Sequence, residues 1–261
     1  MLEGFDQKST VTSSEHVRAI MTPHAGLRYS GQVATDAWKS CRIPETVIIV
    51  GPKHTRLGAD WAVSCSSAWQ IPSSHGKEFA SFTIDAELSH QIAQGVQGME
   101  LDAAAHFREH GAEIQLPILD WLTGDAQNKP KLVCIAMGNA NWDEIQLAAK
   151  QLADVIRPHA EKVLFAISSD MNHFAEDQEN RRRDRLALDA LSTGDPKQLL
   201  DVCQSNGISM CGVVPAALVM QTLKELGMQT KIEQLSYDTS AGVTGDASRV
   251  VGYAAARWVT T

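Results

Sequence analysis

Residues 46–54 read TVIIVGPKH, an apolar and largely β-branched run that stops at a Gly-Pro turn and is followed by His54. Residues 17–26 read VRAIMTPHAG and repeat the pattern, with His24 directly after the proline. Both stretches are typical of a short buried strand that ends at a turn. Ligands of an open α/β sheet bind beyond the carboxyl ends of its strands, so we expect both histidines to face the same crevice. Because neutral histidine is the commonest metal ligand, the pair favours a metal site.

Strands and helices alternate along the rest of the chain. Further strands are predicted over residues 60–66, 131–137, 161–168, 231–237 and 248–256. Helices are predicted over residues 32–39, 84–93, 109–122 with a kink or restart at Pro117, 141–156, 179–191, 196–204 and 215–226. This order predicts a single α/β domain over residues 1–261, with a mostly parallel central sheet and helices on both faces. Within it, residues 1–14 are polar and are expected to form a flexible N-terminus.

The composition excludes several classes of protein. A net charge of -8 argues against nucleic acid or an anionic membrane as the main partner. The one basic cluster, residues 181–185, is bracketed by carboxylates and is typical of a solvated helix face. The longest apolar run, residues 213–220, is too short to cross a bilayer, and the polar N-terminal residues lack the apolar core of a signal peptide. Five cysteines without paired spacing indicate reduced thiols, so we expect a cytoplasmic protein.

Asp170 and His173 follow another predicted strand, residues 163–167, in the sequence SSDMNH. A carboxylate and an imidazole three residues apart in such a turn can act as a metal ligand and its orienting partner, or as an acid/base pair. Alternatively, Asp170 only caps the segment that follows.

Cys211 directly precedes the predicted helix that begins near Pro215. Amide dipoles at a helix N-terminus stabilise a thiolate, which is both the nucleophilic and the metal-binding form of cysteine. The other four cysteines lie in runs that suit small buried apolar side chains.

Glu109 and His110 lie at the start of the predicted helix over residues 109–122, together with Glu113. These charges are interpreted either as simple capping or as one wall of a catalytic site. Tyr29, His75 and His106 lie in predicted loops and are further candidates for the mouth of the crevice.

At these residues the chain resembles the MEMO family, the proteins labelled protein B of the AmmeMemoRadiSam system in bacteria and archaea. The matching pieces are residues 23–26 (PHAG) with 29–31 (YSG), 51–54 (GPKH), Glu109-His110 with Glu113, 115–117 (QLP), 168–170 (SSD) with His173, 210–212 (MCG) with Pro215, and 252–255 (GYAA). They run in family order over nearly the whole chain.

The resemblance implies a fold like that of class III extradiol ring-cleaving dioxygenases, which hold non-haem Fe(II) with two histidines and a carboxylate. In the MEMO family the corresponding pocket resembles two histidines and a cysteine, which here are His24, His54 and Cys211. Asp170 and His173 match further pocket residues of the family, and His110 matches an additional histidine. Family members are associated with iron or copper.

The residues and the resemblance together predict a metal-dependent redox or dioxygenase-like enzyme that acts on an unknown small substrate. His24, His54 and Cys211 are the predicted ligands of Fe(II) or Cu, and these ligand types do not exclude zinc. Three protein ligands leave a position open for O2 or substrate. Asp170, His173 and His110 are the predicted catalytic residues.

Two alternatives stay open from the sequence. The same crevice can serve as a non-catalytic binding module for a peptide or for a partner protein of the radical-SAM system. A true extradiol dioxygenase that acts on a catechol would need a carboxylate as third ligand, for which Asp170 or Glu109 are available.

Overall fold

The computed structural model describes residues 16–124 and 129–261. The N-terminus that was expected to be flexible, residues 1–14, lies outside the described residues. Within those two ranges, no helix is long and apolar enough to span a membrane.

Four buried parallel strands form the centre of the sheet, in the order β1-β8-β2-β7. They are β1 (Val17–Thr22), β8 (Val163–Ser168), β2 (Thr46–Pro52) and β7 (Lys131–Met137). Their near-continuous apolar sequences are typical of strands that are covered on both faces. The fold that the sequence predicts is therefore confirmed at its core.

Antiparallel strands extend the sheet at both sides, which makes it mixed. β11 (Val250–Thr260) pairs with β1, and β10 (Thr230–Thr239) pairs with β11. On the other side, β3 (Trp61–Val63) runs antiparallel to β7, and β6 (Met99–Leu101) is parallel to β3. The short β9 (His173–Ala175) pairs with the start of β11, so the described sheet has nine strands.

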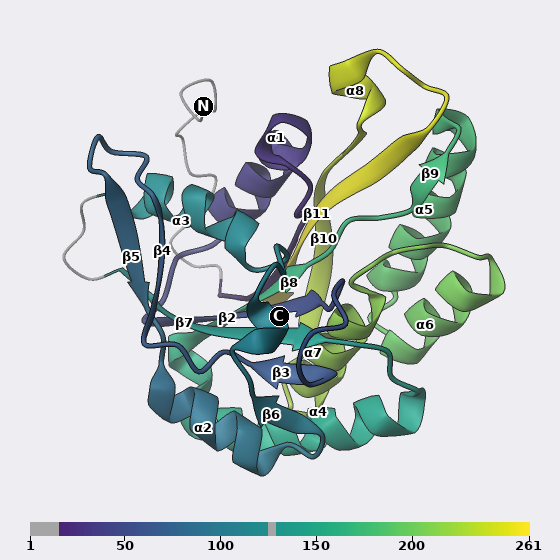
Figure 1. Cartoon of the computed structure of the whole chain (residues 1–261). Coiled ribbons are helices and arrows are strands. Elements are labelled where there is room, and N and C mark those ends of the chain that lie inside the picture. Colours follow the sequence, from purple (N-terminus) through teal and green to yellow (C-terminus); the bar gives the residue numbers. More distant parts are fainter. Residues whose placement is uncertain (1–15, 125–128) are drawn as a thin grey trace.

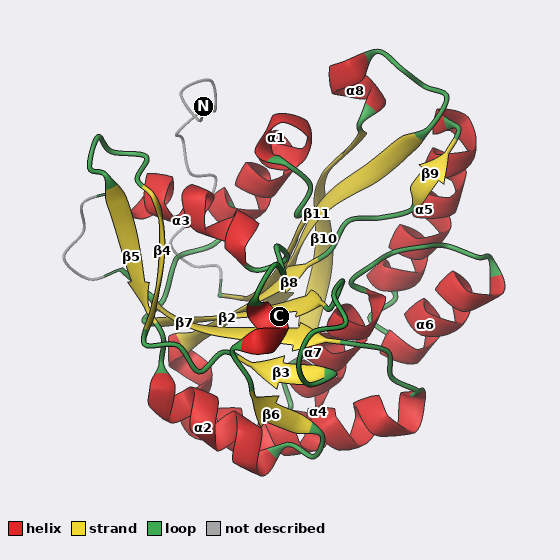
Figure 2. Cartoon of the chain, viewed as in Figure 1, coloured by secondary structure: helices red, strands yellow, loops and turns green. Residues whose placement is uncertain are grey.

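Helices cover both faces of the sheet (Figures 1 and 2). One face carries α2 (Ala86–Gly95), α4 (Trp142–Ile156), α5 (Asp177–Ser192), α6 (Pro196–Ser205) and α7 (Val213–Glu225). The other carries α1 (Leu27–Lys39), α3 (Leu116–Thr123) and the hairpin of β4 (Ala68–Pro72) and β5 (Phe79–Thr83). A short α8 (Ala241–Thr244) lies between β10 and β11. Successive residues of each central strand pack into opposite core layers, as pleated strands require.

The helix predicted over residues 109–122 is wrong in its first part. A 3₁₀ turn occupies Glu113–Gln115, and α3 begins only at Leu116. Residues 109–112 form a loop in which the carboxylate of Glu109 accepts backbone N–H groups from its own segment and from the loop after β2. The hairpin strand β5 and the three-residue strands β6 and β9 were not predicted, because such short elements depend on their pairing partners rather than on periodicity.

The topology brings three loops to one edge of the sheet. β8 lies between β1 and β2, and all three strands are parallel, so their carboxyl ends emerge side by side. The segments that leave this edge carry His24, Asp170 and His54. The loop before α7, which carries Cys211, completes the group at the same edge.

Candidate metal centre

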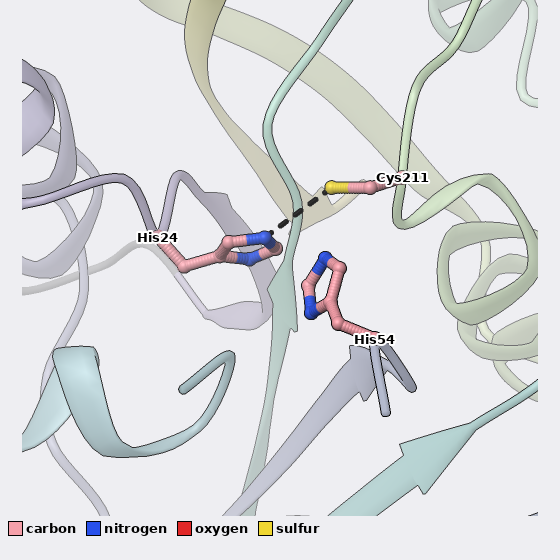
Figure 3. A group of neighbouring side chains, drawn as sticks. All are labelled: His24, His54 and Cys211. Atoms are coloured by element: carbon pink, nitrogen blue, oxygen red, sulfur yellow. Dashed lines mark hydrogen bonds between the residues drawn. The ribbon is translucent and has the colours of Figure 1, made fainter. Parts of the chain in front are cut away.

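His24, His54 and Cys211 meet at the carboxyl edge of the sheet (Figure 3). One possible ligand atom from each residue lies within 4.8 Å of the other two. Nε2 of His24 is 3.3 Å from Sγ of Cys211, and the two imidazole rings meet edge to face with centroids 5.1 Å apart. The structure therefore brings together the three residues that the sequence predicts as metal ligands.

His24 is buried, and its tautomer is fixed by Ser168. The Ser168 hydroxyl donates its proton to the carbonyl of Gly111 (2.5 Å) and accepts a hydrogen bond from Nε2 of Gln115 (3.1 Å). Its remaining lone pair faces Nδ1 of His24 at 2.9 Å, so Nδ1 must be the protonated nitrogen. The lone pair of Nε2 is left free towards Cys211. Burial lowers the pKa of His24 to about 4, which keeps the ring neutral at neutral pH.

Gln115 holds this arrangement in place from behind. Its side chain is fully buried, and its amide nitrogen donates to the Pro23 carbonyl (2.9 Å) as well as to Ser168. Its amide oxygen accepts from the Thr22 hydroxyl (3.0 Å) and from the indole nitrogen of Trp38 (2.9 Å). The amide thus has all four of its hydrogen bonds, and it can present only its N–H side to Ser168.

His54 is oriented by a carboxylate instead. Oε1 of Glu109 lies 2.8 Å from Nδ1 of His54, and Oε2 accepts the backbone N–H of the same residue (2.5 Å). The Gly111 N–H also donates to Oε1 (3.1 Å). Burial opposes ionisation of Glu109, but the hydrogen bonds from His54 and Gly111 prevail and lower its pKa to about 2. An ionised carboxylate only accepts, so Nδ1 of His54 donates, and Nε2 of the neutral ring keeps a free lone pair.

Cys211 presents its sulfur from the loop that leads into α7. Sγ accepts the backbone N–H of Asp170 (3.2 Å), while the hydroxyl of Ser169 accepts the N–H of Gly212 (2.9 Å) and so braces the loop. Burial and the nearby charge of Asp170 raise the pKa of Cys211 to about 12. The expected stabilisation of the thiolate by the helix start is thus outweighed, and a bound cation is needed to keep this sulfur ionised.

Asp170 supports the site through the backbone. Its Oδ1 accepts the N–H groups of His24 (2.8 Å) and Ala25 (3.2 Å), so its carboxylate shapes the loop that carries the first histidine. In the described structure Asp170 thus does not cap the segment that follows it, and its Oδ1 supports the loop that carries a candidate ligand.

His110 joins the imidazole cluster. Its ring stacks on that of His54, with centroids 4.7 Å apart and planes 21° from parallel, and meets His24 edge to face at 5.3 Å. Its side chain is 54% exposed, whereas that of His54 is 33% exposed. His54, Glu109 and His110 form a second group whose possible ligand atoms lie within 4.8 Å.

His173 lies at the start of β9. Its Nδ1 is 2.9 Å from the Ser209 carbonyl, and its N–H donates to the Ser209 hydroxyl. Among the described residues, no hydrogen bond, ion pair or ring contact links His173 to any of the three candidate ligands. Its two hydrogen bonds to Ser209 connect it to the segment that carries Cys211.

A buried polar network holds that segment. Asn172 accepts the Ser209 N–H (3.0 Å) with its side-chain oxygen, and its own N–H donates to Asp184 (2.7 Å). Asn180 (2.9 Å) and the hydroxyl of Tyr237 (2.7 Å) also donate to Asp184. Asp184 lies on α5 and is fully buried, and this burial raises its pKa to about 6.

The other candidates from the sequence do not join the cluster. Nε2 of His75 is 2.9 Å from the Asp120 carbonyl, and the ring of His106 packs against Trp69. Of the remaining cysteines, Cys41, Cys134 and Cys203 are buried in the core and Cys65 is exposed; all five are free thiols.

Sequence reasoning missed Ser168 and Gln115, and it left the role of Glu109 open between capping, a catalytic wall and a third metal ligand. Ser168 is a polar residue that ends a buried apolar strand, and Gln115 is the polar residue among the apolar side chains that lead into α3. Those two exceptions to the apolar pattern, and their place in the quoted family motifs, are the signals that could have pointed to them.

Comparisons with known proteins give the family of the chain. A family model described as "Memo-like protein" matches residues 1–257. A MEMO1 family protein of Aquifex aeolicus is 33% identical over 253 residues, which cover 97% of this chain and 88% of that protein. A MEMO1 family protein of Ignicoccus hospitalis is 35% identical over 243 residues, which cover 91% of this chain and 81% of that protein.

Among solved structures, that of the "uncharacterized protein JW3007 from Escherichia coli K12" is similar, with a TM-score of 0.58. The match covers 92% of this chain and 99% of that one at 11% identity, which shows a shared fold alone. The family match over nearly the whole chain confirms the resemblance on which the sequence prediction rests. The chain therefore belongs to the MEMO family of Memo-like proteins.

Proposed function

We propose that the chain is a metal-dependent redox enzyme with dioxygenase-like chemistry on a small substrate, in which His24, His54 and Cys211 hold iron or copper. One observation carries the proposal. Both histidines have Nδ1–H committed to a fixed acceptor, so both present the Nε2 lone pair beside the same half-buried sulfur. Such orientation of imidazoles by a hydrogen bond at the opposite nitrogen is typical of metal ligands.

The donor set fits the proposed ions. A thiolate and two imidazoles suit copper and iron, and zinc has compatible ligand preferences. A cation also compensates the burial of Cys211, whose pKa of about 12 keeps it a thiol otherwise. When bound, the ion supplies a redox-active Lewis acid with a coordination position open to substrate or O2.

The surrounding residues have separate tasks in this proposal. Glu109 and Ser168 fix the two ring tautomers, and Asp170 shapes the loop of His24. His110 is half exposed and in ring contact with both ligand histidines, so its imidazole is placed to accept or donate a proton on bound substrate. His173 stays a predicted catalytic residue whose Nδ1 is occupied by the Ser209 carbonyl.

The test is metal content after purification without oxygen. We expect about one iron or copper per chain in the wild type and a loss in His54→Ala and in Cys211→Ser. His90→Ala and Cys203→Ser are matched controls that keep the metal, because neither residue lies in the ligand cluster. Circular dichroism checks that each variant is folded.

A folded wild type that takes up no metal under reducing conditions contradicts the proposal. The alternative of a peptide- or partner-binding module then becomes the better explanation. It predicts that His24→Ala and Cys211→Ser leave partner affinity unchanged, whereas an enzyme loses turnover in both variants while its fold survives.

A further inference from the structure

The arginines of this acidic protein fall into two groups. Most have a carboxylate partner within 4.0 Å; they are Arg18, Arg157, Arg181, Arg182, Arg183, Arg185 and Arg257. Five exposed arginines have no such partner among the described residues: Arg28, Arg42, Arg56, Arg108 and Arg249. In a chain with a net charge of -8, unneutralised cations are a feature that needs a reason.

Four of these five belong to segments of the metal centre. Arg28 lies four residues after His24, Arg56 two residues after His54, Arg108 two residues before His110, and Arg249 packs on Phe174, the neighbour of His173. The fifth, Arg42, precedes the first residue of β2 and so lies at the opposite edge of the sheet. Among the described residues, the arginines without a carboxylate partner are therefore concentrated in the segments of the site.

Three of the four stack on exposed aromatic rings. The Arg249 guanidinium carbon lies 4.5 Å from the ring centroid of Phe174, that of Arg108 lies 5.6 Å from Phe107, and that of Arg28 lies 5.9 Å from Tyr29. The rings of Phe107 and Phe174 are 64% and 61% exposed. A guanidinium that rests its face on a ring keeps its N–H donors at its edge, where they are available to a carboxylate or phosphate.

Two of these segments also have unusual backbone. Arg108 (φ 66°) and Phe174 (φ 65°) are the only non-glycine residues with positive φ in residues 16–124 and 129–261. Residues other than glycine rarely adopt this left-handed backbone conformation, and where it persists it is associated with functional sites. The strain thus falls in the same two arginine–aromatic pairs, and it supports a recognition role for them.

We propose that Phe107, Arg108, Phe174 and Arg249 form an anion-binding rim that admits a small organic acid with a planar carbon framework as substrate of the metal centre. The arginines bind the anionic oxygens, and the exposed rings contact the planar part. That the bound acid is a substrate rests on the proposed function of the metal centre, whereas anion binding by the rim does not require the metal. The segment after Cys211 continues with apolar residues and offers no cation to an anionic ligand, so the arginines of the other segments are the available cations.

Benzoate, acetate and inorganic phosphate are the probes for this rim. We expect calorimetric titration at low salt to give tighter binding of benzoate than of acetate or phosphate, because only benzoate offers both an anion and a ring. Arg108→Gln and Arg249→Gln should each weaken benzoate about threefold, and the double variant about tenfold. Phe174→Ala should weaken benzoate but not acetate.

Arg42→Gln is the matched control, since Arg42 is exposed and unpaired but lies at the other edge of the sheet. Benzoate affinity in the double variant equal to that of Arg42→Gln overturns the proposal, and so does phosphate that binds as tightly as benzoate. Repeating the titration in Cys211→Ser separates the hypothesis of the metal centre from that of the anion-binding rim. Arginine-dependent binding that persists there supports the rim whether or not the wild type holds a metal, and binding that disappears there overturns it.

Discussion

Two buried carboxylates support the centre from opposite sides, and they have opposite protonation behaviour. Glu109 braces His54, and hydrogen bonds lower its pKa to about 2 in spite of burial. Asp184 braces the segment before Cys211 through Asn172, and burial raises its pKa to about 6. Each accepts three hydrogen bonds from the residues around it.

The difference lies in the donors and in their distance from the ligands. Glu109 receives one imidazole N–H and two backbone amides, and it contacts a candidate ligand directly. Asp184 receives one amide and two neutral side-chain donors, and it lies behind the loop. The carboxylate with the lowered pKa therefore orients a candidate ligand directly, whereas the one with the raised pKa only positions the segment that carries a candidate ligand.

The pH dependence of the free energy of unfolding distinguishes Asp184 from Glu109 most strongly. The folded-state pKa of Asp184, about 6, is above its ordinary value of 3.8, so the unfolded chain ionises first as pH rises. The contribution is fully present below about pH 4 and is lost as pH rises towards 6, by about 3 kcal/mol at about 1.4 kcal/mol per pH unit. Urea denaturation from pH 4 to 7 should show this loss in the wild type and not in Asp184→Asn. Asp189→Asn, an exposed change on the same helix, should keep the wild-type slope; equal slopes in all three proteins contradict the expectation.

Replacing the carboxylate of Glu109 should lower the affinity of the candidate centre for metal. Glu109→Gln keeps the size of the side chain but removes the acceptor that holds Nδ1 of His54 as a donor, so we expect a loss of about 10- to 100-fold in metal affinity. Competition with a chelator measures it. Glu113→Gln is the control, because Glu113 is exposed one turn further on. An unchanged affinity in Glu109→Gln would show that its carboxylate does not set the tautomer.

Ser168→Ala tests the hydroxyl that accepts the Nδ1–H of His24. Without the hydroxyl, Nδ1 of His24 and the Gln115 amide lose an acceptor, and the Gly111 carbonyl loses a donor. We expect metal affinity to fall about tenfold and the free energy of unfolding to fall by about 1–3 kcal/mol. Ser192→Ala, at an exposed hydroxyl on α5, should change neither quantity. A variant with wild-type affinity and stability would remove Ser168 from the site.

The smallest effect is expected at Glu179, whose pKa resembles that of Glu109. Hydrogen bonds from Arg182 and Arg183 lower the pKa of Glu179 to about 2, but this carboxylate lies on the solvated face of α5. We expect Glu179→Gln to leave metal affinity unchanged and to shift the denaturation midpoint by no more than the error of the measurement. A clear loss of stability would mean that burial is not what distinguishes the two glutamates.

The sequence predicted that the two histidines meet because each follows a local signal, and the resemblance to the MEMO family added Cys211 as the third candidate ligand. His24 and His54 come directly after β-branched runs, so the topology of a parallel sheet is enough to bring them together. The parallel core could be predicted for the same reason. The basic cluster on α5 was also interpreted correctly, as its arginines pair with neighbouring carboxylates.

The braces could not be predicted because they depend on contacts between distant segments. Glu109 bonds a residue 55 positions earlier, and the apolar spacing after it favoured a helix that in fact begins at Leu116. Gln115 bonds Trp38 across 77 positions. No local pattern predicts that Glu109 will contact an imidazole or that Asp184 will contact asparagines.

The place of β1 in the sheet has a consequence for how the protein matures. This first described strand lies between β8 and the last strand, β11, and His24 faces a sulfur 187 positions further along the chain. During synthesis the ribosome must therefore release nearly the whole polypeptide before the two histidines and the thiol can meet. The complete set of candidate ligands exists only once residue 211 has been synthesised, so no N-terminal fragment that stops short of it can carry all three.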